Sequence, residues 1–192
     1  MLRPILALLL LTTVLSAQDS NAPKPLHLDA DEPGEPLLVY IQHNPACFGK
    51  SADGEINANA GETTGPDGTK LVSGICEIRY SKKEHATAFG IPLIRRHAEF
   101  EANRIQTFGY TFRRASYEQI RAMMFREFGQ PTNVSVSPQS ECETLNWDND
   151  VSLALLQQCS GPEADQVEVG FISMQLIDKL MKKAEHPEQP EP

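Results

Sequence analysis

The sequence lacks the short motifs that mark common catalytic and nucleotide-binding sites. It contains no G-x-S-x-G nucleophile elbow, no P-loop, no G-x-G-x-x-G turn and no H-E-x-x-H helix. The histidines are scattered along the chain, and two of them, His27 and His186, stand in the two tails. We therefore expect no catalytic residue, no cofactor and no metal site, and a non-enzymatic binding or interaction module of the cell envelope. A small extracytoplasmic hydrolase with an unrecognised site is the alternative.

The sequence also lacks a hydrophobic run long enough to cross a membrane. Its longest apolar stretch, Ile5 to Leu15, has eleven residues and is interrupted by Thr12 and Thr13, whereas a spanning helix needs about 20. It follows Arg3 and precedes the small residues Ser16 and Ala17. This order is typical of a secretory signal peptide over residues 1–17, cleaved near Ala17.

A lipid-attachment cysteine is missing at the expected cleavage site. Leu15, Ser16 and Ala17 are followed by Gln18, and a bacterial lipoprotein signal resembles this junction except that a cysteine stands there. We therefore expect no lipid at Gln18, no stable membrane anchor, and a periplasmic or secreted mature protein.

Positive charge is scarce and unevenly placed. The chain has 17 lysines and arginines against 26 acidic residues, a formal net charge of -9, so nucleic acid is not expected as a partner. Residues 91–130 nevertheless hold seven arginines against four acids. The hairpin expected there would bring four of them to one end of the sheet as a candidate anion-binding patch: Arg95, Arg96, Arg113 and Arg114. Its partner is either the domain's own acids, an anionic envelope component or another protein.

Cysteine is rare, and no pair has the C-x-x-C spacing of zinc and redox motifs. The four cysteines lie at positions 47, 76, 142 and 159. An even number in an exported chain predicts two disulfides, for which three connectivities are possible. We favour Cys47–Cys76 and Cys142–Cys159, because each pair brackets a local hairpin. Closing the shorter loop should stabilise the fold by about 3 kcal/mol.

Runs of proline and glycine divide the chain. Residues 18–36 carry Pro23, Pro25, Pro33 and Pro36 among acids and predict a linker. A similar composition predicts a disordered tail over 185–192. Residues 37–184 then form one domain, in which the glycine-rich stretch 42–70 is an irregular loop.

Hydrophobic periodicity gives the elements of that domain. A compact apolar run predicts a buried strand at 37–41. Alternation and turn signals predict a strand at 71–80, a hairpin over 91–112 that turns at Asn103, a second hairpin over 144–157, and a strand at 166–172. Helical spacing predicts a helix between Ser116 and Gly129 and a last helix after Ser173, with Leu176, Ile177, Leu180 and Met181 facing inward. The sum is an α+β fold, an antiparallel sheet of hairpins with two main helices packed on one face.

Part of this pattern resembles that of a known group of domains. It consists of the run Phe108-Gly109-Tyr110-Thr111-Phe112, the capped helix that ends at Phe128-Gly129-Gln130-Pro131-Thr132, the lone Trp147, and Val151-Ser152-Leu153. From about Phe100 to Leu176 the chain resembles small exported bacterial domains of unknown function. This resemblance implies a periplasmic or secreted location and no activity.

Overall fold

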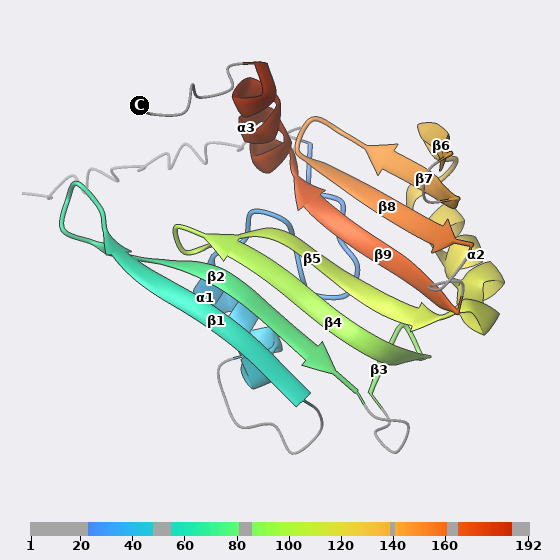
Figure 1. The fold of residues 1–192 in the computed structure, drawn as a ribbon, viewed down its shortest axis with the longest axis horizontal. Coiled ribbons are helices and arrows are strands. Elements are labelled where there is room, and N and C mark those ends of the chain that lie inside the picture. The colour runs from blue at the N-terminus through green and yellow to red at the C-terminus, as the bar shows by residue number, and fades with distance from the viewer. Residues whose placement is uncertain (1–22, 48–54, 81–85, 139–140, 161–164, 186–192) are drawn as a thin grey trace, which may run out of the picture.

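The structure is a computed structural model, which describes residues 23–47, 55–80, 86–138, 141–160 and 165–185. The expected signal peptide at 1–17, the expected tail from 186 onward and part of the expected loop (48–54) lie outside these residues. Within them the fold is α+β and dominated by one sheet of nine strands, in which every pairing is antiparallel (Figure 1).

The sheet has the order β1-β2-β4-β5-β9-β8-β7-β6, and the short β3 pairs with β4. The strands are β1 Glu55–Thr64, β2 Lys70–Arg79, β3 Thr87–Ala88, β4 Ile91–Glu101, β5 Arg104–Arg113, β6 Asn133–Ser137, β7 Cys142–Asp148, β8 Ser152–Cys159 and β9 Gln166–Ser173. The helices are α1 Leu37–His43, α2 Tyr117–Phe128 and α3 Met174–Glu185. Most neighbours in the sheet are consecutive along the chain. The exception is β5, which pairs with β9, because the chain continues from β5 through α2 to β6 at the far edge of the sheet.

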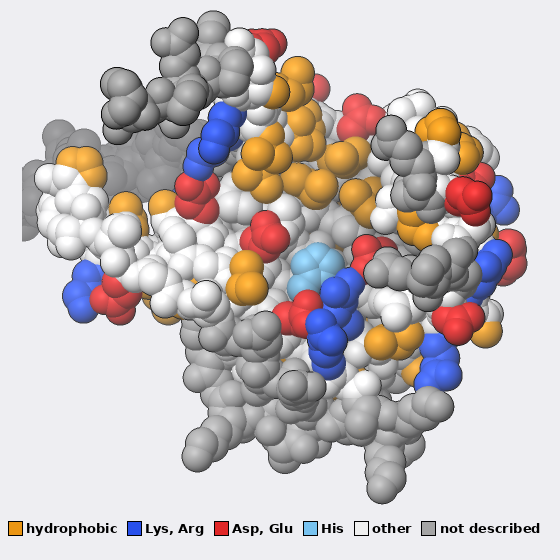
Figure 2. Space-filling view, in the orientation of Figure 1, with side chains coloured by type: hydrophobic (Ala, Val, Ile, Leu, Met, Phe, Trp, Pro, Cys, Tyr) orange, Lys and Arg blue, Asp and Glu red, His pale blue; other side chains and the backbone are white. Residues whose placement is uncertain are grey.

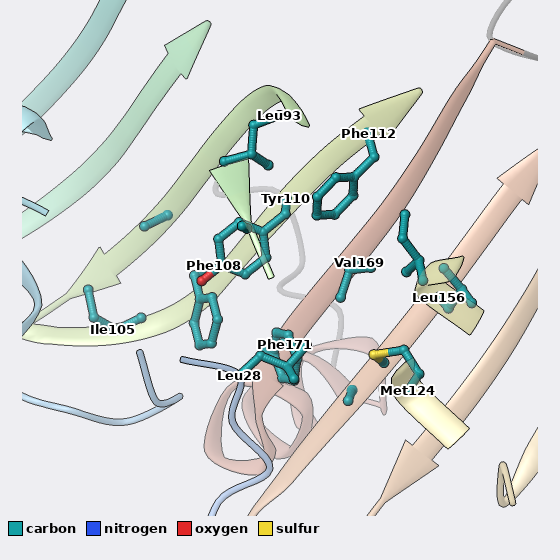
Figure 3. Close-up of a cluster of buried hydrophobic side chains, with 14 of the residues drawn as sticks. Leu28, Leu93, Ile105, Phe108, Tyr110, Phe112, Met124, Leu156, Val169 and Phe171 are labelled. Atoms are coloured by element: carbon teal, nitrogen blue, oxygen red, sulfur yellow. The ribbon is translucent and has the colours of Figure 1, made fainter. Parts of the chain in front are cut away.

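Burial alternates along the central strands, so the two faces of the sheet differ. Every second residue of β9 is buried, from Val167 to Ser173, and the residues between them are half-exposed. Strand β8 alternates in the same way from Ser152 to Leu156. The buried side chains form a single core with residues of α1, α2 and the segment before α1 (Figure 3). In the view of Figure 1, α1 and α2 lie behind the sheet.

The central hairpin and the helix after it confirm their sequence predictions. Strands β4 and β5 pair, and the turn passes through Ala102 and Asn103, both with positive φ. Helix α2 buries Ile120, Met123 and Met124 and ends at Gly129, whose φ of 78° favours glycine. At the start of α2, the Ser116 side chain makes no capping hydrogen bond.

The predicted strand at 37–41 is wrong: these residues form α1. Pro36 has the extended backbone of an N-cap, after which Leu37 and Tyr40 are buried while Leu38 is 75% exposed. A spacing of three between buried residues is that of a helix lying on a sheet. The uniformly apolar run concealed this period.

The predicted irregular loop over 42–70 is also wrong in its second half. Residues 55–64 form β1, which pairs with β2 over ten residues in register. As an edge strand it has one neighbour, so it does not need the apolar alternation by which strands are recognised in a sequence.

The described part of the expected linker, residues 23–36, packs on the core. Leu28 is 5% exposed and Asp31 is 3% exposed. The backbone bonds to the β4–β5 hairpin, since Gly34 N donates to Ile105 O at 2.7 Å and Ile105 N donates to Glu35 O at 3.0 Å. Proline and acid content predicted a solvated segment, but long-range contacts hold it in place.

Helix α3 differs from its prediction as an inward-packed helix. It buries no residue, and Leu180 and Met181 are more than half exposed. Ser173 does cap it, since Leu176 N donates to Ser173 Oγ at 3.3 Å. The predicted amphipathic helix is present, but none of its apolar side chains is buried against another element.

Two disulfides are present, and their pairing is the one favoured by the sequence. Cys47–Cys76 joins the 3-10 turn Pro45–Cys47 after α1 to strand β2. Cys142–Cys159 joins directly opposed residues of β7 and β8. Such bonds are consistent with a secreted or extracellular protein. None of the described helices is both long and apolar enough to span a bilayer.

Candidate functional site

A polar cluster lies among the buried side chains at the N-terminal half of the core. An irregularity in β4 creates it: the register shifts between Leu93 and Arg95, so Arg96 falls on the same face as Leu93. Arg96 thereby meets Asp31 and Asn44, which come from the segment before α1 and from the residue after it. We refer to Asp31, Glu35, Tyr40, His43, Asn44, Arg96 and Tyr110 as the Asp31 cluster.

Asp31 is the centre of this cluster and is almost fully buried. Its Oδ2 accepts a hydrogen bond from the Tyr110 hydroxyl at 2.9 Å and lies 3.7 Å from the Arg96 guanidinium. Its Oδ1 accepts from Asn44 Nδ2 at 2.8 Å and lies 3.9 Å from His43 Nδ1. Arg96 also donates to Asn44 Oδ1 and stacks 5.0 Å from the centre of the Tyr110 ring. Asp31 and Arg96 therefore balance each other's charge.

The Glu35 carboxyl has no oppositely charged partner among the described residues. It is 9% exposed, and its Oε1 accepts a hydrogen bond from the Glu32 backbone N–H at 3.2 Å. Burial, with smaller contributions from the charges of Asp31 and Glu32, raises the pKa of Glu35 to about 7. Among the described residues, no lysine or arginine forms an ion pair with it.

Two further polar groups face the same region. The Tyr40 side chain is 1% exposed, and its hydroxyl has no hydrogen-bond partner among the described residues. Burial raises the pKa of Tyr40, and the charges of Asp31, Arg96 and Glu35 lie close enough to influence it less strongly. His43, in the last turn of α1, is partly exposed and links the buried groups to solvent. Donor atoms of Asp31, Glu35 and His43 all lie within 4.8 Å of one another.

The raised pKa of Glu35 makes stability depend on pH. Its carboxyl holds a proton up to about pH 7 in the folded protein but only to about 4.5 when unfolded, so folding favours the protonated form. Unfolding free energy should therefore fall by about 1–3 kcal/mol as pH rises from about 4.5 to 7. Urea unfolding in EDTA, at several pH values, measures this for wild type and Glu35→Gln. A stability difference between the two proteins that did not change with pH would contradict the prediction.

The opposite face of the sheet carries a second group of polar residues. His97, in β4, lies flat against Gly109 of β5: a Cβ at Gly109 would be 2.6 Å from His97 Cε1. Gly109 pairs with Gly170 of β9, so two neighbouring strands have no side chain in this row. Burial and, less strongly, the charge of Arg95 hold the pKa of His97 below its ordinary range. His97 is therefore neutral near pH 7.

This row is hollowed into a groove. Two adjoining hollows, of about 260 and 270 Å³, share His97, Glu99 and Glu168 in their lining. Ion pairs join Arg95 to Glu77 of β2 and to Glu168 of β9, so the charged border reaches across the groove. Toward β8 the lining is more apolar and includes Leu155 and Ile172. Figure 2 shows this face, with a histidine near its centre, charged side chains beside it and hydrophobic side chains toward α3.

The candidate anion-binding patch is divided between the two faces. Arg96 enters the Asp31 cluster, whereas Arg95 points to the groove and pairs with Glu77 and Glu168. Arg113 is exposed at the end of β5, and Arg114 begins the following 3-10 turn. The structure thus places Arg95 and Arg96 on internal acids and does not bring the four guanidinium groups together.

Sequence reasoning missed both the Asp31 cluster and the groove. Asp31 and Glu35 were assigned to a linker, and His43 was counted only among the scattered histidines. The available signal was the charge itself, because Arg96 shares a period-two row with Ala98 and Phe100, which are buried, and needs an acid beside it. Comparison of the chain with protein families, with curated proteins and with solved structures gives no match.

Proposed function

We propose that the protein is a non-enzymatic binding module that acts outside the cytoplasm, and that the groove on the sheet face opposite the core is its binding surface. The observation that carries this is the pair of adjoining hollows over β4, β5 and β9, which share His97, Glu99 and Glu168 in their lining. Gly109 and Gly170 have no side chains of their own, so His97 and Leu155 lie low over them and an extended ligand can approach the sheet closely. Apolar and charged borders on its two sides would orient that ligand.

The partner that fits this surface is a segment of another protein with both apolar and basic side chains. Leu155 and Ile172 offer apolar contact beside the groove. Glu99 lines both hollows and is exposed, and the whole chain has a net charge of -9, which favours a cationic partner. Because Arg95 is already paired with acids of this chain, an anionic polymer fits less well.

A hydrolase would need its reactive groups to open onto a substrate-sized hollow. Two hollows have volumes of about 730 and 560 Å³. The first lies beside α2, and its lining includes His27 and Glu127. The second is lined mainly by residues of α1, β1 and β2. Neither is lined by Asp31, Glu35 or His43. The buried titratable groups of the Asp31 cluster thus lie apart from these spaces, which favours binding over catalysis.

The location is part of the proposal. Two disulfides support an oxidising compartment, and the run from Arg3 to Ala17 supports export with cleavage near Ala17. N-terminal sequencing of the protein from culture supernatant or periplasm should return Gln18 as the first residue.

A random peptide library displayed on phage tests the binding surface. Peptides selected on the immobilised wild-type protein should be enriched in Leu, Ile, Lys and Arg. Leu155→Asp puts a charge at the apolar border where the peptide's apolar side chains would contact it, so it should weaken binding of a selected peptide by about tenfold or more. Fluorescence anisotropy with the labelled peptide measures the affinity.

Val136→Asp is the matched control. Val136 is 65% exposed in the edge strand β6, so this change adds the same charge to an apolar strand residue away from the groove. Its affinity should equal that of wild type. Equal binding by Leu155→Asp and wild type, or equal loss in both variants, would refute the groove as the binding surface.

A further inference from the structure

A second site is formed on the other side of the sheet by the Asp31 cluster. We propose that Asp31, Glu35 and His43 bind one divalent transition-metal ion, of the type represented by Zn²⁺. The site is independent of the peptide-binding groove, because the two lie on opposite faces of β4. Its ligands come from two neighbouring pieces of chain, the turn before α1 and the last turn of α1 itself.

The donor set fits such an ion in type and spacing. One imidazole nitrogen and two carboxylates are a ligand combination used for zinc, and three protein ligands leave a coordination position open. An imidazole among the donors favours zinc over magnesium or calcium, which prefer oxygen. The donor atoms lie within 4.8 Å of one another, so small side-chain rotations bring them to bonding distance. The partly exposed His43 provides the path of entry.

With Glu35 ionised, the cluster has one negative charge more than Arg96 balances, and this charge is available to a cation. Arg96 lies 3.7 Å from Asp31 Oδ2, on the oxygen that also accepts from Tyr110. The other oxygen, Oδ1, faces His43 and Asn44. Arg96 therefore balances Asp31 from the far side without occupying the oxygen that faces His43. Glu35 is buried and has no basic partner among the described residues, and a buried carboxylate without one is costly.

The Tyr40 hydroxyl is an independent indication of a ligand. Tyr40 is 1% exposed, and its hydroxyl faces the region of Asp31, Arg96 and Glu35 without a hydrogen-bond partner in the described structure. Buried hydroxyls are normally satisfied. A donor or acceptor carried by a bound ion's own coordination shell would satisfy it.

The cluster is also held in place, as a binding site requires. Asn44 Nδ2 donates both to Asp31 Oδ1 and to the Tyr40 carbonyl at 3.2 Å, which fixes the end of α1 against the turn. Three residues later Cys47 is bonded to Cys76 of β2. Such outer contacts orient ligands and commonly change metal affinity by about 10–100-fold when removed.

Zinc titration of the full secreted protein tests the proposal. The protein is treated with EDTA, freed of it, and titrated with ZnCl₂ in competition with a chromophoric chelator. Wild type should bind one zinc ion per chain. His43→Gln and Glu35→Gln should each weaken binding by about tenfold or more. X-ray absorption at the zinc edge should show nitrogen and oxygen ligands with imidazole and no sulfur.

Two substitutions serve as controls. His27→Gln removes another exposed histidine near the N-terminus, and Glu118→Gln removes an exposed acid of α2; both should bind zinc as wild type does. Circular dichroism checks that His43→Gln keeps its fold, which the partial exposure of His43 favours. Absence of zinc binding tighter than about 0.1 mM, or equal affinity in wild type and His43→Gln, would overturn the proposal.

Discussion

Replacing Asp31 by alanine should lower the unfolding free energy by about 3–5 kcal/mol, because it leaves the Arg96 guanidinium buried without a counter-charge. The Arg96 side chain is 19% exposed and that of Asp31 only 4%. The same change removes the acceptor for the Tyr110 hydroxyl and for Asn44 Nδ2. Urea unfolding at pH 7 in EDTA, followed by circular dichroism, measures the loss.

Two variants isolate the cause of that loss. Glu118→Ala breaks the surface pair with Arg121, in which the Glu118 side chain is 81% exposed, and should cost no more than about 0.5 kcal/mol. Asp31→Ala combined with Arg96→Met removes the unpaired charge, so it should be more stable than Asp31→Ala alone. If the double variant were the less stable one, the buried ion pair would not explain the effect.

Removing the Cys47–Cys76 disulfide by alanine at both positions should cost about 3.5 kcal/mol. The bond closes a loop with a sequence separation of 29 residues, against 17 for Cys142–Cys159, and a longer loop restricts the unfolded chain more. Cys47 and Cys76 are also at least 98% buried, being 1% and 2% exposed, so their sulfur atoms contribute to the core. Chemical denaturation of both double variants, under identical conditions, gives the comparison.

The disulfide prediction has a direct contradiction. A loss below about 1 kcal/mol for Cys47→Ala/Cys76→Ala would show that the bond adds little to a loop already fixed by its other contacts. Mass spectrometry after thiol labelling of the unreduced, denatured protein should find no reactive cysteine, as both bonds require.

Elements with a clear local period were predictable from the sequence. Phe108, Tyr110 and Phe112 alternate along the core face of β5, and α2 combines helical spacing with a terminal Gly129. Cysteine spacing led to the pairing seen in the structure. Each of these signals is contained within about 30 residues, where composition and geometry are closely linked.

Features that depend on distant parts of the chain were not predictable. The run 37–41 is apolar at every position, so its period was hidden, and the fold decided between helix and strand. The burial of Asp31 depends on Arg96, which is 65 positions later and reaches the core face through the irregularity after Leu93. The position of Arg96 indicates that an acid lies beside it, but the local sequence shows neither which acid this is nor where the bulge falls.

The strand order sets a condition on how the chain can fold. Strand β5 finds its second neighbour only in β9, and the N-terminal segment bonds to the β7–β8 turn, where Leu26 N donates to Ser152 Oγ across 126 positions. Contacts of such long sequence separation slow folding. Until β9, which begins at Gln166, is available, β1, β2, β4 and β5 form one half-sheet and β6, β7 and β8 form another. A chain that ends before β9 exposes the edges of β5 and β8, both of which are free to join the wrong partner and aggregate.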